Sequence, residues 1–135
     1  MSNKQYSNVN VVLMNATYNF EKVDGELQIS LNTTDTISIE KVLEKSFIVY
    51  VSRRLWFEPM SNTYVQVAYE VQISTNEKES VAGITKAIKE GNSAFGAIFT
   101  KASLLISQIT NESAFGPIIT VPMYNPKTVE IVTKI

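Results

Sequence analysis

The chain has 135 residues, of which 44% are apolar and 19% are charged, and its formal net charge is −1. This length fits one domain, and this composition is typical of a globular protein rather than of a disordered chain. The near-neutral charge excludes the basic balance that attracts nucleic acid or an anionic membrane. No apolar run approaches the roughly 18 residues of a membrane span, and the polar first residues lack a signal-peptide core, so we expect a cytoplasmic protein.

Cysteine and histidine are both absent from the sequence. Their absence excludes thiol nucleophiles, disulfide bonds, Cys/His zinc sites and histidine-based acid–base catalysis. The carboxylates do not suggest a catalytic pair, because Glu40, Glu44, Glu77 and Glu79 fit solvated helix or loop positions. We therefore expect no enzyme, no catalytic residue, no metal site and no cofactor.

Four segments in the first half of the chain have the pattern of β-strands. They are residues 9–20, residues 27–32 with a continuation through Ile39, residues 46–57 and residues 64–73. In the first, the side chains expected on one face are Val12, Met14, Ala16, Tyr18 and Phe20. In the last and clearest, the core-facing side chains are Val65, Val67, Tyr69, Val71 and Ile73. The dipeptide Asp24-Gly25 favours a hairpin between the first two strands.

The third predicted strand contains a pair of arginines and a pair of aromatic residues, and each pair has two possible roles. Arg53 and Arg54 fit either an anion-binding site or the charges that keep an exposed strand from aggregating. Trp56 and Phe57 are either core residues or, if exposed, part of an interaction surface.

The second half of the chain begins with helical patterns. Residues 76–90 are weakly helical and stop at Gly91, whereas residues 94–110 have a strong apolar face with three- and four-residue spacing. That face consists of Phe95, Ile98, Phe99, Ala102, Leu105, Ile106 and Ile109. Pro117 and Pro122 then exclude a continued helix and predict an extended apolar segment. Residues 128–134 alternate again, as either a short edge strand or a mobile tail. Four strands followed by a helix predict an α+β fold with an antiparallel sheet.

Two stretches resemble the SecB-type protein-export chaperones. The sequence LLISQITNESAFGPIITVPMYNP, residues 104–126, is similar to the end of that family's long helix and its following proline-bounded loop. YEVQ, residues 69–72, is similar to the family's fourth strand, which carries an acidic residue at the position of Glu70. The order of four strands and a long helix also agrees, and the resemblance extends over about residues 11–125.

The resemblance implies a single SecB-like domain over residues 1–135, with a four-stranded antiparallel sheet and the long helix packed on one of its faces. Residues 1–8 and 126–135 are the candidates for flexible ends. It also implies a cytoplasmic holdase, a chaperone that binds unfolded polypeptides without ATP, in protein export or translocation. Family members are homotetramers, built as dimers of dimers with the helices between subunits, so we expect a homo-oligomer, either a dimer or a tetramer.

The resemblance also assigns roles to residues. Unfolded clients would bind in a groove bordered by Trp56, Phe57, Phe115, Ile118, Ile119 and Tyr124. Glu70 would lie on the outer sheet face, where a translocase motor of the SecA type docks. The subunit interface would contain Phe95, Ile98, Phe99, Ala102, Leu105 and Ile106. No nucleic acid and no membrane insertion are implied.

The chain departs from the family in four ways. It is nearly neutral, whereas export chaperones are acidic, and its connection between the first two strands is cut to about residues 22–26. The family pairs the first strand with the fourth, whereas Asp24-Gly25 favours the first with the second, so both pairings remain alternatives. No lid-like second helix is visible in PKTVEIVTKI, residues 126–135. We expect a reduced relative, serving either export or one dedicated client; the alternative is a small apolar-ligand-binding or structural interaction module without chaperone activity.

Overall fold

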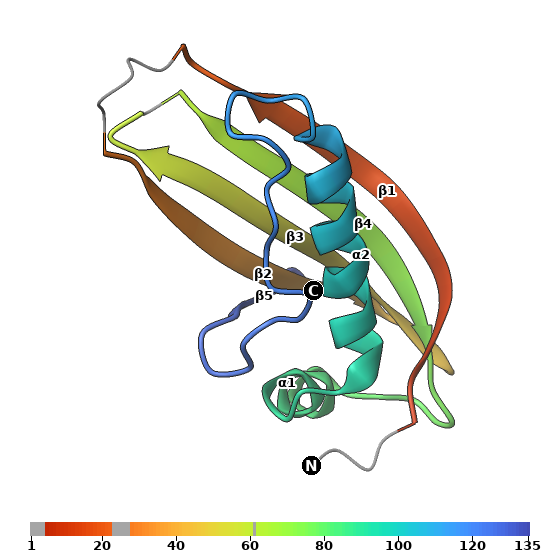
Figure 1. Cartoon of the computed structure of the whole chain (residues 1–135). Coiled ribbons are helices and arrows are strands. Elements are labelled where there is room, and N and C mark those ends of the chain that lie inside the picture. The colour runs from red at the N-terminus through yellow and green to blue at the C-terminus, as the bar shows by residue number, and fades with distance from the viewer. Residues whose placement is uncertain (1–4, 23–27, 61) are drawn as a thin grey trace.

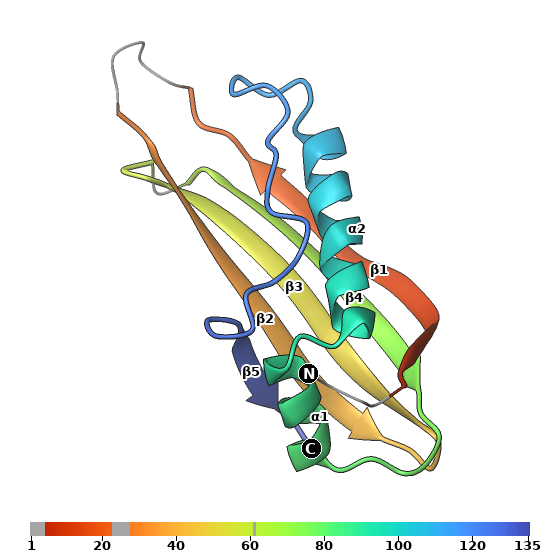
Figure 2. The ribbon, with the colours of Figure 1, turned by 60° about the horizontal axis from the view of Figure 1, so that its bottom comes forward.

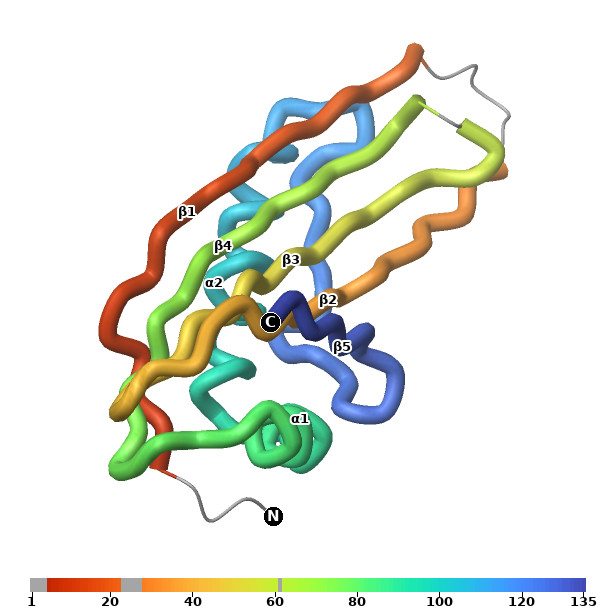
Figure 3. The backbone as a smooth tube through the Cα atoms, turned by 180° about the vertical axis from the view of Figure 1, so that it is seen from behind, coloured from red at the N-terminus to blue at the C-terminus, as the bar shows by residue number. Residues whose placement is uncertain are grey.

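The computed structural model describes residues 5–22, 28–60 and 62–135. Within them the elements are β1 (Ser7–Asn19), β2 (Ser30–Val42), β3 (Ser46–Glu58), β4 (Tyr64–Ser74), α1 (Val81–Lys89), α2 (Ser93–Ile109) and β5 (Glu130–Thr133). The strands form one sheet in the order β1-β4-β3-β2-β5. Both helices lie on the same side of it (Figure 1), and the view from behind shows the opposite face without a helix (Figure 3). The predicted α+β class is confirmed.

β1 pairs with β4, not with β2. The β1–β4, β4–β3 and β3–β2 pairs are all antiparallel, so β4 and β3 separate the first two strands. The hairpin prediction from Asp24-Gly25 is therefore wrong, although the dipeptide itself lies outside the described residues. A turn dipeptide specifies a local chain reversal, whereas the partner of a strand is decided by which edges remain to be covered.

β1 contains a β-bulge at Met14. Leu13 lies opposite Tyr69 of β4 and Asn15 lies opposite the preceding β4 residue, so Met14 is an extra residue in the ladder. One extra residue reverses which side chains face the core. The helix-facing side chains are therefore Val11 and Leu13 before the bulge and Ala16 and Tyr18 after it. The single apolar face predicted from Val12 to Phe20 is wrong before Met14.

The core lies between the helices and the inner face of β2, β3 and β4. Alternate strand residues meet the apolar faces of α1 and α2, and 16 large examples are Ile37, Ile39, Phe47, Val49, Val51, Leu55, Val65, Val67, Val71, Ile73, Ile84, Ile88, Phe95, Ile98, Phe99 and Ile106. Ser80 caps α1, since its Oγ accepts a hydrogen bond of 3.0 Å from the Gly83 N–H. The predicted stop at Gly91 is confirmed by its positive φ of 75°.

The last described strand, β5, decides between the two readings of residues 128–134. It pairs in parallel with β2 from Thr36 to Ile39 and so forms the outer edge of the sheet beside β2 (Figure 2). The edge-strand prediction is confirmed. Over the described ranges, none of the helices is both long and apolar enough to cross a bilayer.

Candidate functional site

The segment that follows α2 runs back beside the helix, over the inner face of β3 and β2 (Figure 1, Figure 2). We call residues 117–126 the return segment. Its start is fixed by Thr110, whose buried hydroxyl donates to the Ile106 carbonyl (2.6 Å) and accepts from the Ile118 N–H (2.8 Å). Thr110 thus both ends the helix and places the segment on the sheet.

Side chains, not another strand, hold the middle of the return segment. Four successive carbonyl groups, from Thr120 to Met123, accept hydrogen bonds from hydroxyl or guanidinium donors. The donors are Ser103 for Thr120 (2.9 Å), Arg53 for Val121, Thr100 for Pro122 (2.7 Å) and Arg53 for Met123 (3.1 Å). The segment is therefore extended and fixed without belonging to the sheet.

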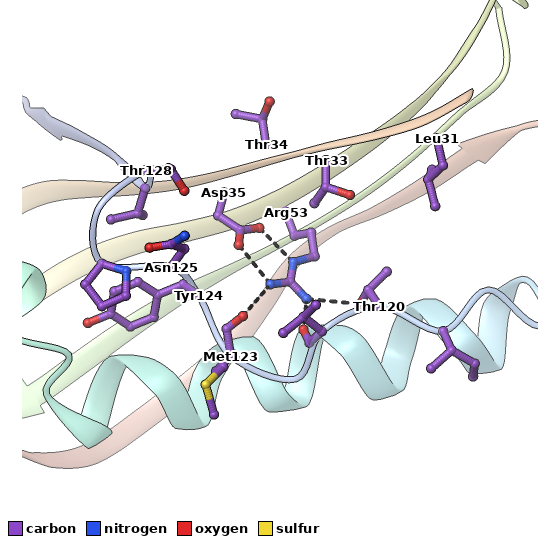
Figure 4. A pocket seen from close by; sticks show the side chains of 14 residues that line it. Leu31, Thr33, Thr34, Asp35, Arg53, Thr120, Met123, Tyr124, Asn125 and Thr128 are labelled. Atoms are coloured by element: carbon purple, nitrogen blue, oxygen red, sulfur yellow. Dashed lines mark hydrogen bonds and ion pairs between the residues drawn. The ribbon is translucent and has the colours of Figure 1, made fainter. Parts of the chain in front are cut away.

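Arg53 is the centre of this arrangement (Figure 4). Its guanidinium makes two hydrogen bonds with the Asp35 carboxylate, of 2.7 and 2.8 Å, and one of 3.0 Å with the Thr120 hydroxyl. With the two carbonyls of the return segment, all five of its N–H donors are used. The side chain is only 2% exposed, and its guanidinium carbon lies 5.2 Å from the centre of the Phe99 ring. Arg53 therefore ties the return segment to β2 and β3.

The structure separates the two arginines that the sequence presents as a pair. Arg53 faces the core, whereas Arg54 is exposed on the opposite face and lies 5.1 Å from the centre of the Tyr64 ring. β3 is an internal strand, so neither arginine protects a sheet edge. Arg53 is not a free anion site either, because its donors are already occupied. The signal for its role was its shared parity with Leu55 and Phe57, both of which are buried.

A groove of about 740 Å³ opens between β2 and the return segment. From β2 it is lined by Leu31, Thr33 and Asp35, and across from them by the return segment and the residues that lead to β5. Three alternate residues of the return segment, Ile119, Val121 and Met123, are 76%, 65% and 61% exposed. Neighbouring apolar side chains this exposed mark an interaction site more often than a chance surface.

The six residues predicted to border a client groove do not all meet there. Ile119 and Tyr124 line it. Phe57 is buried and stacks on the half-buried Phe115 at the border of the core, with ring centres 4.9 Å apart, and the Ile118 side chain is buried. Trp56 points to the opposite face of the sheet and donates to Glu58 Oε1 (3.3 Å). The sequence did not predict Val121 and Met123 as groove residues, because the apolar pattern of an extended segment without a partner strand does not show which of its side chains are exposed.

The other predicted site residues are placed as follows. Glu70 is exposed on the uncovered face of the sheet. The predicted interface residues of α2 pack instead on the sheet of their own chain: Phe95, Ile98, Phe99, Ala102 and Ile106 are buried, and Leu105 is half-buried. The exposed large apolar side chain of this helix is Leu104, which is 60% exposed. Among the described residues, no group of three or more acidic side chains is placed to hold a metal ion.

Tyr124 fastens the far end of the return segment to α1. Its hydroxyl donates to the Ile88 carbonyl (2.7 Å), and burial raises the pKa of this phenol to about 12. A raised pKa in the folded state means that Tyr124 stabilises the fold fully below pH 10 and loses this contribution as the pH rises toward 12.

We expect Tyr124→Phe to lower the free energy of unfolding at pH 7 by about 0.5–1.5 kcal/mol, through the lost hydrogen bond. It should also reduce the loss of stability between pH 10 and pH 12, without abolishing it, because burial raises the pKa of Tyr6 and Tyr69 as well. Urea unfolding at pH 7, 10 and 11.5 checks both effects. An unchanged pH dependence in the variant would contradict this role of Tyr124.

Comparison with known proteins links this architecture to one solved chaperone. No protein-family model matches the chain, and no curated protein matches its sequence. The fold is similar to that of the SecB-like chaperone Rv1957 of Mycobacterium tuberculosis, solved in complex with a ChAD peptide from the Rv1956 HigA1 antitoxin. The TM-score is 0.63 at 10% sequence identity, over 88% of either chain. A protein of unknown function from Streptococcus agalactiae matches at a TM-score of 0.37 and 11% identity, over 89% of this chain and 98% of that one. The chain therefore has a SecB-like fold.

Proposed function

We propose that this protein is an ATP-independent holdase that binds non-native polypeptides in the groove between β2 and the return segment. The main support for this proposal is a row of three exposed apolar side chains, Ile119, Val121 and Met123, on a backbone that is fixed by hydrogen bonds. A fixed apolar wall loses little conformational entropy on binding, so weak contacts with many sequences suffice. The similar chaperone Rv1957 binds an antitoxin peptide, which supports a polypeptide as the occupant.

The charges of the groove favour a polypeptide over a nucleotide. Arg53, the basic residue that lines it, is neutralised by Asp35 and has no donor left for a phosphate. The proposal therefore includes neither an enzymatic step nor a cofactor, and it places the protein in the cytoplasm, where it would hold clients for export or serve one dedicated client.

The test is suppression of the aggregation of reduced insulin, without nucleotide. The unaltered protein should suppress it at stoichiometric amounts. The triple variant Ile119→Ser, Val121→Ser, Met123→Ser should need at least roughly tenfold more, since partial burial of each apolar side chain contributes about 0.5–1 kcal/mol, a fraction of the value for full burial. Ile119→Val, Val121→Ile, Met123→Leu is the matched control, because it keeps an apolar wall. A folded protein that does not suppress aggregation, or a serine variant that is as active as the control, would overturn the proposal.

A small apolar ligand is the second candidate occupant. The volume of about 740 Å³ lies within the range of roughly 300–1,000 Å³ that ligand pockets occupy. Native mass spectrometry of the purified protein should then show a retained small molecule, and the serine variant should lose it. A holdase would instead show the bare chain and bind reduced insulin.

We also propose that a second copy of the chain covers β1 and the outer side of α2. β1 is a sheet edge of 13 residues with exposed Leu13, Met14 and Tyr18, and a shallow groove of about 340 Å³ separates Leu13 from Leu104. Several exposed apolar side chains that lie together in this way mark a protein contact. This places the subunit contact on Leu104 and β1 rather than on the buried face of α2, in a dimer or a dimer of dimers.

We expect light scattering at tens of micromolar protein to give a dimer or a tetramer. Leu13→Glu with Leu104→Glu should give a smaller species, because two charges would be buried without partners. Thr17→Glu, on the outer face of the same strand, is the matched control and should not change the mass. A monomeric unaltered protein would contradict this assembly.

Docking of a SecA-type translocase motor at Glu70 is the part of the proposal that decides between export and a dedicated client. Glu70 is exposed, and no helix of the described residues covers the sheet face seen in Figure 3. Calorimetry with a SecA-type motor should give binding that Glu70→Gln weakens. Equal binding by both proteins, or none, would argue against motor docking at this residue.

A further inference from the structure

The outer edge of β2 is a continuous row of backbone donors and acceptors. In a strand, the N–H and C=O groups of alternate residues point to the same edge. The Lys134 N–H donates to the Ile39 carbonyl (3.0 Å), so the backbone of Ile39 faces β5. The ladder with β3 has no irregularity from Ser30 to Ile39, so Leu31, Thr33 and the other odd-numbered residues face the same edge.

β5 occupies only one part of this edge. It pairs with β2 from Thr36 to Ile39, and in the described part of the chain no strand pairs with the edge from Ser30 to Thr34. The groove lies beside this unpaired part, since Leu31 and Thr33 line it together with Thr128 and Val129, the residues just before β5. A strand added to the free part would therefore lie in line with β5.

β5 is a short strand, held by its backbone pairing with β2 and by the Ile131 side chain, which packs against the core. It has four residues; Glu130 and Thr133 are exposed, and Ile131 and Val132 are half-buried. Within the described ranges, no side chain of these four residues makes a hydrogen bond or an ion pair. The turn before β5 closes on Asn125, whose carbonyl accepts from the Thr128 and Val129 N–H groups at 3.1 and 3.0 Å. The return segment is anchored separately as far as Tyr124, so release of β5 would leave these anchors in place.

We propose that an extended client segment pairs with the free edge of β2 and that β5 is a displaceable occupant of the same edge. This inference rests on the proposed holdase function and adds its regulation: β5 limits pairing to the stretch from Leu31 to Thr34, and its release extends the stretch to Ile39. The client that fits has alternating apolar side chains and no net charge, because one of its faces meets Leu31 and Ile119 and the Arg53–Asp35 pair is already neutral.

A reversible lock tests this directly, because the chain has no native cysteine. Thr36 and Glu130 are register partners, so Thr36→Cys with Glu130→Cys places two thiols for a disulfide between β2 and β5. The probes are two fluorescein-labelled peptides of alternating Val and Thr, one matched in length to Leu31–Thr34 and one to Leu31–Ile39. Oxidation should weaken binding of the longer peptide by roughly tenfold, which corresponds to one or two backbone hydrogen bonds, and leave the shorter peptide unchanged. Reduction should restore binding.

A releasing variant should have the opposite effect. The Val132 N–H points toward β2, because Val132 has the parity of Lys134, whereas the Thr133 N–H points away. Val132→Pro should therefore release β5 and tighten binding of the longer peptide by several fold, and Thr133→Pro is the matched control. Two further peptides carry N-methyl groups on either the odd-numbered or the even-numbered backbone nitrogens. Only one of these two sets of N–H groups faces β2 in an added strand, so only one of the two methylated peptides should lose binding.

The outcomes separate this inference from the proposed function. If the unaltered protein neither binds the peptides nor suppresses aggregation, the holdase function fails and this inference fails with it. If it does both, but the lock and Val132→Pro leave the longer peptide unaffected, only the role of β5 is overturned. If the two methylated peptides, odd-numbered and even-numbered, bind equally well, strand pairing is overturned.

Discussion

Replacing Arg53 with methionine should lower the free energy of unfolding by about 3–5 kcal/mol, the typical cost of breaking a buried ion pair on one side. The substitution removes five hydrogen bonds at once. It leaves the Asp35 carboxylate, which is 13% exposed, without its cation. It also leaves the Val121 and Met123 carbonyls without donors, so the return segment should loosen from the sheet. Urea unfolding followed by circular dichroism measures the change.

The neighbouring residue provides the control for this prediction. Arg54→Met alters the same kind of side chain on the exposed face and should change the free energy of unfolding by less than about 0.5 kcal/mol. The double variant Arg53→Met, Asp35→Leu should recover a large part of the loss, because apolar residues of similar size replace buried ion pairs well. Equal stability of the Arg53 and Arg54 variants would show that Arg53 does not hold the return segment.

Replacing Phe99 with alanine should cost about 3–5 kcal/mol of unfolding free energy, the range for a buried aromatic side chain. Phe99 is fully buried in α2, with the Arg53 guanidinium 5.2 Å from its ring centre and the Tyr124 ring 5.3 Å away, centre to centre. The cavity would lie directly beneath the return segment. Thermal unfolding by calorimetry gives the size of the effect.

Leu104 is the matched control for Phe99, on the exposed side of the same helix. Leu104→Ala should change the free energy of unfolding by no more than about 0.5 kcal/mol when measured at a concentration where the chain is monomeric. A Phe99 variant as stable as this control would mean that the core under the groove adjusts without cost. Such a result would contradict a fixed groove wall.

The sequence predicted most of the elements because their patterns are local. α2 and β4 repeat apolar residues at 3.6 and 2 residues, and both elements lie within one residue of their predicted ends. The partner of β1 was not predictable in this way, since Asp24-Gly25 reports a turn and not the strand that fills an edge. The bulge at Met14 left no mark in the alternation, because apolar residues flank it on both parities.

The groove was only partly predictable for a different reason. The prolines of the return segment indicate that it is extended. The position of a segment without a partner strand, however, depends on which hydrogen-bond donors lie near its carbonyl groups in the folded chain. Here those donors are Arg53, Thr100 and Ser103, which lie on β3 and α2, far away in the sequence. For Arg53 the sequence left an anion site and a charge on an exposed strand as alternatives, because a buried arginine is rare. Its partner Asp35, 18 residues earlier, makes its burial favourable.

The edge of β1 and the edge of β2 differ in continuity. The ladder of β1 is interrupted twice, at Val9 and at Met14, and each extra residue twists the strand and shifts its donors out of phase. The backbone hydrogen bonds of an added strand can therefore match those of β1 over only a few residues, and the stacking of many chains into a fibril is disfavoured. The edge of β2 has no such interruption as far as Ile39. In the proposed function, extended clients would therefore pair with the edge of β2, and β1 would not serve as a template for the growth of aggregates.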